Sequence, residues 1–154
     1  MNFSDLHPFF THFPIAFFIL IFIIEIIRLF MSRIDPIVSL IILFLGTTVS
    51  FLSVQTGQIQ KETYIKMTES EKNNISDDKI NTLENHQNQG NTIMWASIII
   101  LFIWFYLHLN SFDNRFLKLV LSLILVVLVL KTASLGGILA KSSYKSHLTQ
   151  KTAK

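Results

Sequence analysis

The fold is decided near the N-terminus, where residues 6–20 read LHPFFTHFPIAFFIL. Two histidines and two prolines stand at the start of an apolar run that continues to Phe30. Proline is tolerated in the first turn of a helix, because the amide groups there have no helical partner. The stretch therefore predicts a membrane-spanning helix whose first turns carry imidazole, the side chain that most often binds metals.

The composition indicates a membrane protein. The chain of 154 residues is 51% hydrophobic and only 15% charged, whereas a soluble domain carries about a quarter charged residues. There is no cysteine, which excludes disulfides, thiolate zinc sites, iron–sulfur ligation and a covalently attached c-type haem. The net charge of +3 is modest and the lysines are spread along the chain, so no nucleic-acid partner is expected.

Four apolar runs predict four membrane spans. Two of the links between them are short, at 31–36 and 111–115, and a short link makes the next helix an antiparallel neighbour. We therefore expect a single all-α transmembrane domain over residues 1–154, an up-down-up-down four-helix bundle with a retained first helix and no cleaved signal peptide. The expected spans are 14–30, 37–54, 93–109 and 116–139.

The long connection at 58–91 is polar and rich in both acids and lysines. We expect the second helix to end near Gly57, since glycine favours a helix C-terminus. Ser76 followed by two aspartates is a good helix start, so the third helix should begin in water near Asp77 and enter the membrane near Ile93. The last residues, 141–154, form a basic tail without acids.

The up-down-up-down topology gathers polar and small residues at one end of the bundle, which we call the histidine end. There the first helix begins, the second ends, the third begins and the fourth ends. The opposite end carries Glu25, Arg28, Arg33, His108, Asp113 and Arg115. The residues expected at the histidine end are His7, His12, Gly57, His86, Gly90, Gly136 and Gly137.

Glu25 and Arg28 stand three residues apart, close enough to pair on one helix face. The favoured interpretation is an ion pair that reaches the membrane surface. The alternative is that Glu25 is a functional group facing the bundle interior, because carboxylates within spans are costly. Arginines near the short links favour a cytoplasmic location for that end, although the basic tail argues the reverse.

The order of these motifs resembles the DUF2231 family of predicted bacterial membrane proteins. The resemblance covers nearly the whole chain and rests on residues 6–8, 12–16, 56–57, His86 with Gly90, and 136–139. It implies a multi-pass protein of the bacterial inner membrane in a redox setting, since family members are sometimes fused to cytochrome c-like or Rieske-like modules. The family tends to follow the double glycine with an aromatic residue and His-Gly, whereas KSSY stands here at 141–144.

The histidines suit a b-type haem, which needs imidazoles at similar depth on different helices and space for a flat ring. His12 and His86 are the candidate ligands, and the glycines at the histidine end would make room for the ring. His7 and His12 diverge by roughly 140° on a regular helix, so both can reach one cofactor only if Pro8 and Pro14 bend the segment. Otherwise His7 suits a helix cap or a position beside the ligands. Alternatives are another metal held by His12 and His86, or histidines and glycines that only pack helices.

The sequence thus predicts a membrane protein without independent catalytic activity. The first hypothesis is a haem-b-binding electron-transfer or redox-accessory protein with a redox protein as partner. The second is a non-enzymatic scaffold or subunit with structural histidines, or a metal-binding membrane protein. The third is a small-solute or metal transporter, for which only Glu25 and Lys131 offer charge within the spans. No serine elbow and no phosphate loop supports nucleophilic catalysis.

Overall fold

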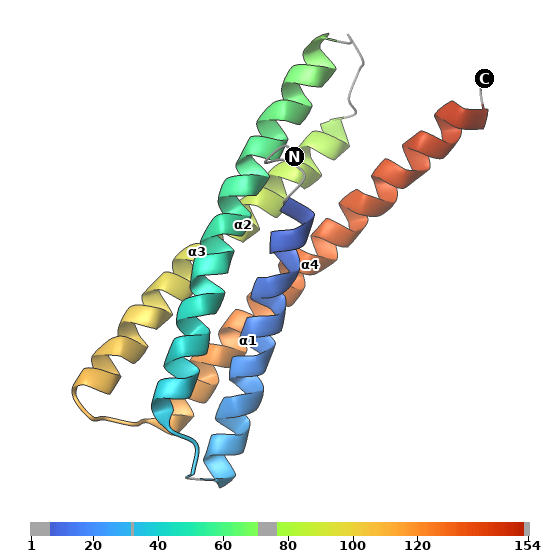
Figure 1. The fold of residues 1–154 in the computed structure, drawn as a ribbon. Coiled ribbons are helices and arrows are strands. Elements are labelled where there is room, and N and C mark those ends of the chain that lie inside the picture. Colours follow the sequence, from blue (N-terminus) through green and yellow to red (C-terminus); the bar gives the residue numbers. More distant parts are fainter. Residues whose placement is uncertain (1–6, 32, 71–76, 153–154) are drawn as a thin grey trace.

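The computed structural model describes residues 7–31, 33–70 and 77–152, with side chains placed over 10–31, 33–59, 61, 62, 66 and 81–137. It is an antiparallel bundle of four helices (Figure 1), and the described residues contain no strand. The prediction of an all-α up-down-up-down bundle is confirmed. The helices are α1 (His7–Phe30), α2 (Pro36–Ser70), α3 (Asp77–Leu109) and α4 (Arg115–Thr152).

The four helices form a closed ring in cross-section. Each helix packs on its neighbours in sequence, and α1 also packs on α4. Among the described residues, no Cα atom of α1 comes within 8 Å of α3, so these two helices lie diagonally across the bundle. A group on α1 can therefore reach α3 only across the bundle axis.

Local capping sets where the helices begin. The Asp35 side chain accepts a hydrogen bond from the Ile37 amide at 2.9 Å, which caps the start of α2. The helix α3 begins at Asp77, as predicted. The expected end of the second helix at Gly57 is wrong, because α2 continues to Ser70. The segment after Gly57 contains Gln, Glu, Lys and Ile, which continue a helix.

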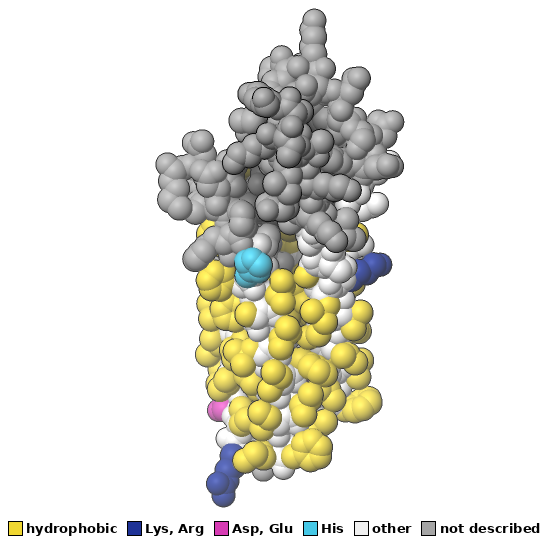
Figure 2. Space-filling model, turned by 90° about the vertical axis from the view of Figure 1, so that its right-hand side faces the viewer, with side chains coloured by type: hydrophobic (Ala, Val, Ile, Leu, Met, Phe, Trp, Pro, Cys, Tyr) yellow, Lys and Arg dark blue, Asp and Glu magenta, His cyan; other side chains and the backbone are white. Residues whose placement is uncertain are grey.

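The outer surface of the bundle is apolar, as a bilayer requires. Figure 2 shows hydrophobic side chains covering most of the described part of one face. The buried apolar residues form one core, which includes Phe18, Leu43, Ile100, Trp104 and Leu125. Polar and charged side chains are buried as well, Glu25 and Arg28 among them. By length and composition, four segments can cross a membrane, namely Phe10–Phe30, Pro36–Ile59, Asn81–Leu109 and Arg115–Gly137.

The helices α1 and α2 approach closely at Gly46. A Cβ atom added there would lie 3.0 Å from the Phe18 ring and 3.1 Å from Cβ of Phe17. Gly46 and Ser50 are both buried. These two small residues, one helical turn apart, thus face the bundle, where small residues allow close helix packing in lipid.

Candidate functional site

The largest cluster of charged side chains inside the bundle lies at the end with the short links. Glu25 and Arg28 on α1 are almost fully buried, with 0% and 1% of their surface exposed. Nη1 of Arg28 donates to both carboxylate oxygens of Glu25, at 2.9 and 3.0 Å. The favoured sequence interpretation, an ion pair that reaches the membrane surface, is therefore wrong, and the pair faces the interior.

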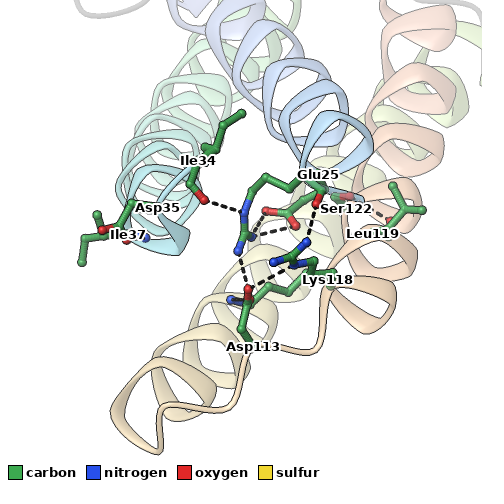
Figure 3. A network of polar contacts seen from close by, with 10 residues as sticks. Glu25, Ile34, Asp35, Ile37, Asp113, Lys118, Leu119 and Ser122 are labelled. Atoms are coloured by element: carbon green, nitrogen blue, oxygen red, sulfur yellow. Dashed lines mark hydrogen bonds and ion pairs between the residues drawn. The ribbon is translucent and has the colours of Figure 1, made fainter. Parts of the chain in front are cut away.

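Asp113 completes this buried ion network from the link between α3 and α4 (Figure 3). One of its carboxylate oxygens accepts a 2.6 Å hydrogen bond from Nη2 of Arg28. The other accepts a 2.8 Å hydrogen bond from Nζ of Lys118 on α4. Arg115 donates to the backbone carbonyl of Arg28 at 2.9 Å, so α1 contacts α4 directly through Arg115 and indirectly through Asp113, which binds both Arg28 and Lys118.

The backbone of the α3–α4 link explains how Asp113 reaches this position. The Phe112 amide donates to the Leu107 carbonyl and the Ser111 amide donates to the His108 carbonyl, which is the Schellman pattern of a helix C-terminus. Ser111 adopts the left-handed conformation this pattern needs, with φ of 55°. Asn114 then caps α4 by accepting from the Leu117 amide at 3.0 Å, so Asp113 is held between two helix ends.

The electrostatics of the network favour the ionised form of Asp113. Burial alone would raise the pKa of Asp113, but hydrogen bonds from Lys118 and Arg28 and the attraction of both cations outweigh burial, so its pKa lies below the ordinary value. The two carboxylates face three cations, which leaves one positive charge in excess. Charges in such a site are costly to bury singly, so each depends on its partners.

Trp104 connects α3 to the same network. Its side chain is 1% exposed, and Nζ of Lys118 lies 5.6 Å from the centroid of its ring, within the range of a cation–π contact. Within the described part of the structure, Nε1 of Trp104 has no hydrogen-bond partner. The ion network thus contacts α1, α3, α4 and, through a 3.4 Å contact from Arg28 to the Ile34 carbonyl, the link before α2.

At the histidine end, the predicted ligands do not converge. His12 on α1 has an exposed side chain. His7 is the first residue of α1, and its side chain lies outside the described residues. His86 on α3 is half-buried. Because α1 and α3 are diagonal partners, an exposed His12 does not face His86 across the bundle. The prediction of haem between these two residues remains untested.

His86 itself packs tightly on α4. A Cβ atom added to Gly136 would lie 3.2 Å from Cε1 of the His86 ring, so the glycine makes room for the imidazole. The ring forms a backbone hydrogen bond with Thr132, while its Nδ1 atom is buried without a hydrogen-bond partner. Gly136 therefore accommodates His86 directly.

The remaining predicted glycines differ in their surroundings. A Cβ atom on Gly90 would meet only Val54 of α2, at 3.6 Å, and one on Gly137 would meet nothing within 4 Å. Gly57 is partly buried within α2. Among the described side chains, no group of three or more His, Asp and Glu residues is placed to hold a metal ion.

The comparison with known families decides the classification. The family model described as a predicted membrane protein, DUF2231, matches residues 4–149, nearly the whole chain. The chain belongs to the DUF2231 family. No curated protein and no solved structure matches it. Together with the four apolar helices, the match makes this DUF2231 protein a multi-pass membrane protein.

From the sequence, the functional site was expected at the histidine end. In the structure, the buried charges lie at the opposite end, next to the short links. Topology correctly assigned Glu25, Arg28, Asp113 and Arg115 to one end, and the spacing predicted the Glu25–Arg28 pair, but the contacts of Arg28 with Asp113 and Arg115 were missed. The sequence did carry a signal for these contacts, because several charged residues stand near the two short links. Charged residues within membrane spans tend to face the interior and to pair with one another.

Proposed function

We propose that this DUF2231 protein is a non-enzymatic subunit or scaffold of the bacterial inner membrane. The observation that carries the proposal is the arrangement of Arg28, which binds Glu25 and Asp113 while almost fully buried. The acids and bases of the network satisfy one another. None of these groups is left unpaired for proton transfer or for binding a transported solute.

The same network argues against a transport cycle at this end of the bundle. Alternating access requires helices to move against each other around a central site. Here Arg28 of α1 binds Asp113 of the α3–α4 link, and Arg115 of α4 donates to the Arg28 carbonyl. Moving α1 away would remove these partners from the buried Arg28, which is strongly unfavourable. A fixed bundle suits a protein that presents surfaces to other proteins in the bilayer.

A partner-binding role is tested by photo-crosslinking in cells. Single photoreactive residues at Trp95, Phe102 and Tyr106 sample the exposed face of α3, and residues at Ile41, Phe44 and Phe51 sample α2. A scaffold should give one discrete adduct from one face and none from the other. Absence of adducts from every face, or turnover of a solute by the purified protein in vesicles, would contradict the proposal.

A second candidate function is cofactor binding through His86, as a b-type haem or metal ligand in a redox-accessory protein. The observation that favours it is the buried Nδ1 atom without a hydrogen-bond partner, since ligand nitrogens and their opposite ring nitrogens are normally both satisfied. A bound haem would supply one-electron chemistry. His86 is half-buried whereas His12 is exposed, which supports His86 as the candidate ligand.

This candidate is tested by the visible spectrum and metal content of protein purified in detergent after expression with ample haem. A Soret band that is lost in His86→Ala but kept in the exposed control His108→Ala would support it. A colourless, metal-free protein would remove it and leave the scaffold role. Loss of the band in His12→Ala alone would overturn the preference for His86.

A further inference from the structure

A groove lies between α3 and α4 towards the histidine end of the bundle. It has a volume of about 150 Å³ and is lined by Gln89, Thr92, Leu128, Lys131 and Thr132. This volume accommodates several water molecules or one small polar group. Four of the five lining residues have polar side chains, although the groove adjoins surfaces that face lipid. These polar side chains do not belong to the ion network of Arg28.

The groove lies at the border between the apolar and polar parts of the helices. On α3 the apolar run 93–109 follows Thr92, and on α4 the apolar stretch 119–130 precedes Lys131. The span candidates on these helices extend somewhat further, to Asn81 and Gly137. A lysine at this depth can carry its ammonium group to the level of the phospholipid headgroups.

The groove offers hydrogen-bond donors and a positive charge. Lys131 is the cation among its lining residues, and none of those residues is acidic. The Thr132 hydroxyl donates to Oε1 of Gln89 at 3.3 Å. The amide oxygen of Gln89 therefore has a partner, and its amide NH₂ group is left as a donor. A group with several acceptor oxygens and a negative charge fits this lining.

Apolar side chains continue from the groove towards the middle of the membrane. Trp95 lies one turn beyond Thr92 on α3 and is 60% exposed. Ile124 lies one turn from Leu128 on α4 and is 45% exposed. An acyl chain attached to a headgroup in the groove can therefore lie against both helices. Free phosphate has no acyl chain and cannot make these apolar contacts.

We propose that this groove binds the phosphate group of an anionic phospholipid, with Lys131 and Gln89 as donors and the acyl chains along the exposed faces of α3 and α4. The assignment does not depend on the scaffold function. Basic pockets between membrane helices are known to hold acidic headgroups. One lysine near the headgroup level is worth about fivefold in affinity for an anionic lipid.

The test is native mass spectrometry of the full-length protein in detergent, titrated with phosphatidylglycerol or with phosphatidylcholine. The unmodified protein should retain phosphatidylglycerol preferentially. Lys131→Gln should lower its affinity about fivefold, whereas Lys66→Gln, an exposed lysine on α2, should leave it unchanged. Gln89→Leu removes the second donor and should weaken retention in a protein that keeps all its lysines.

Three outcomes would overturn the assignment. Equal retention of the two lipids shows that the charge of the headgroup is not recognised. An equal effect of Lys66→Gln shows that only net charge matters. Displacement of phosphatidylglycerol by millimolar inorganic phosphate shows a site for free phosphate instead of a lipid. Melting curves of Lys131→Gln and Gln89→Leu verify that each variant is folded. If only one of them folds, the lipid affinity of that variant decides the test.

Discussion

Arg28 of α1 donates a 2.6 Å hydrogen bond to Asp113, which lies 85 positions further along the chain in the link between α3 and α4. This contact joins the first and last helices, which are neighbours in the bundle but distant in sequence. Because the Arg28 side chain is only 2% exposed, water cannot replace Glu25 and Asp113 as its hydrogen-bond partners. The bundle is thus closed at this end by an electrostatic contact as well as by apolar packing.

Replacement of Arg28 by methionine should destabilise the protein strongly. The change leaves the buried Glu25 carboxylate, 0% exposed, without its cation, and breaking a buried pair costs about 3–5 kcal/mol. The measurement is the unfolding free energy or melting temperature in detergent, followed by circular dichroism. Arg33→Met, at an exposed position, is the matched control and should change stability by less than about 0.5 kcal/mol. Equal effects of the two variants would contradict the role of the network.

The stability of the bundle should depend on pH through Asp113. Its pKa is lowered in the folded state by Lys118 and Arg28, against the opposing effect of burial. A carboxyl group with a depressed folded pKa contributes its full stability above its unfolded pKa of about 3.9. That contribution is lost as the pH falls through the folded value. The melting temperature should therefore fall below about pH 4, and Asp113→Asn should flatten this part of the curve.

The appropriate comparison for this pH profile is Asp35→Asn, which alters the exposed cap of α2 and leaves the ion network intact. Asn is also a good N-cap residue, so this variant should keep the acid-dependent slope of the unmodified protein. If Asp113→Asn keeps the slope as well, another carboxyl group controls the acid transition and the assignment to Asp113 is wrong.

The fold was predictable because it depends on quantities that the sequence carries directly. Four apolar runs of membrane-spanning length and two short links leave little freedom in the topology. The start of α3 at Asp77 was predictable from its acidic first turn. The end of α2 was not, because Gly57 permits a helix end without requiring one, and the polar residues after it continue the helix to Ser70.

The candidate site was less predictable, since it depends on how each helix is rotated about its axis. Topology places His12 and His86 at one end, but only the rotation of α1 leaves His12 exposed. Likewise, the spacing of Glu25 and Arg28 predicts their pairing but not their burial. The position of Asp113 follows from a left-handed residue at Ser111, where the sequence has no glycine to signal it.

Glycine positions 136 and 137 provide a matched pair of substitutions. Alanine at 137 meets nothing within 4 Å, so it should stabilise α4 by about 0.5–1 kcal/mol through its higher helix propensity. Alanine at 136 places its Cβ 3.2 Å from the His86 ring, and overpacking costs about 1–3 kcal/mol. Melting temperatures should therefore rank Gly137→Ala above Gly136→Ala.

The cause of this difference is tested by removing the imidazole. In the double variant Gly136→Ala with His86→Ala, the crowded atom Cε1 is gone, so the cost of the alanine at 136 should disappear. The two changes should then be non-additive by about 1 kcal/mol or more, as expected for residues in contact. Additive effects would show that His86 does not pack on Gly136 in the membrane-extracted protein.

Ser111 offers a stabilising substitution that also tests the geometry of the α3 terminus. Its φ of 55° places a side chain in the left-handed region, which costs a residue with a Cβ atom about 1 kcal/mol relative to glycine. Ser111→Gly should raise the unfolding free energy by roughly this amount while leaving Asp113 in place. Asn110→Gly, one residue earlier and without a positive φ, should give no such gain. Glycine there adds flexibility to the unfolded chain and removes the side-chain hydrogen bond that Asn110 donates to the Tyr106 carbonyl. Chemical denaturation of both variants in the same detergent measures the two changes in unfolding free energy. A larger gain at position 110 than at 111 would mean that the left-handed residue is not Ser111. The path of the chain to Asp113 would then differ from the one described above.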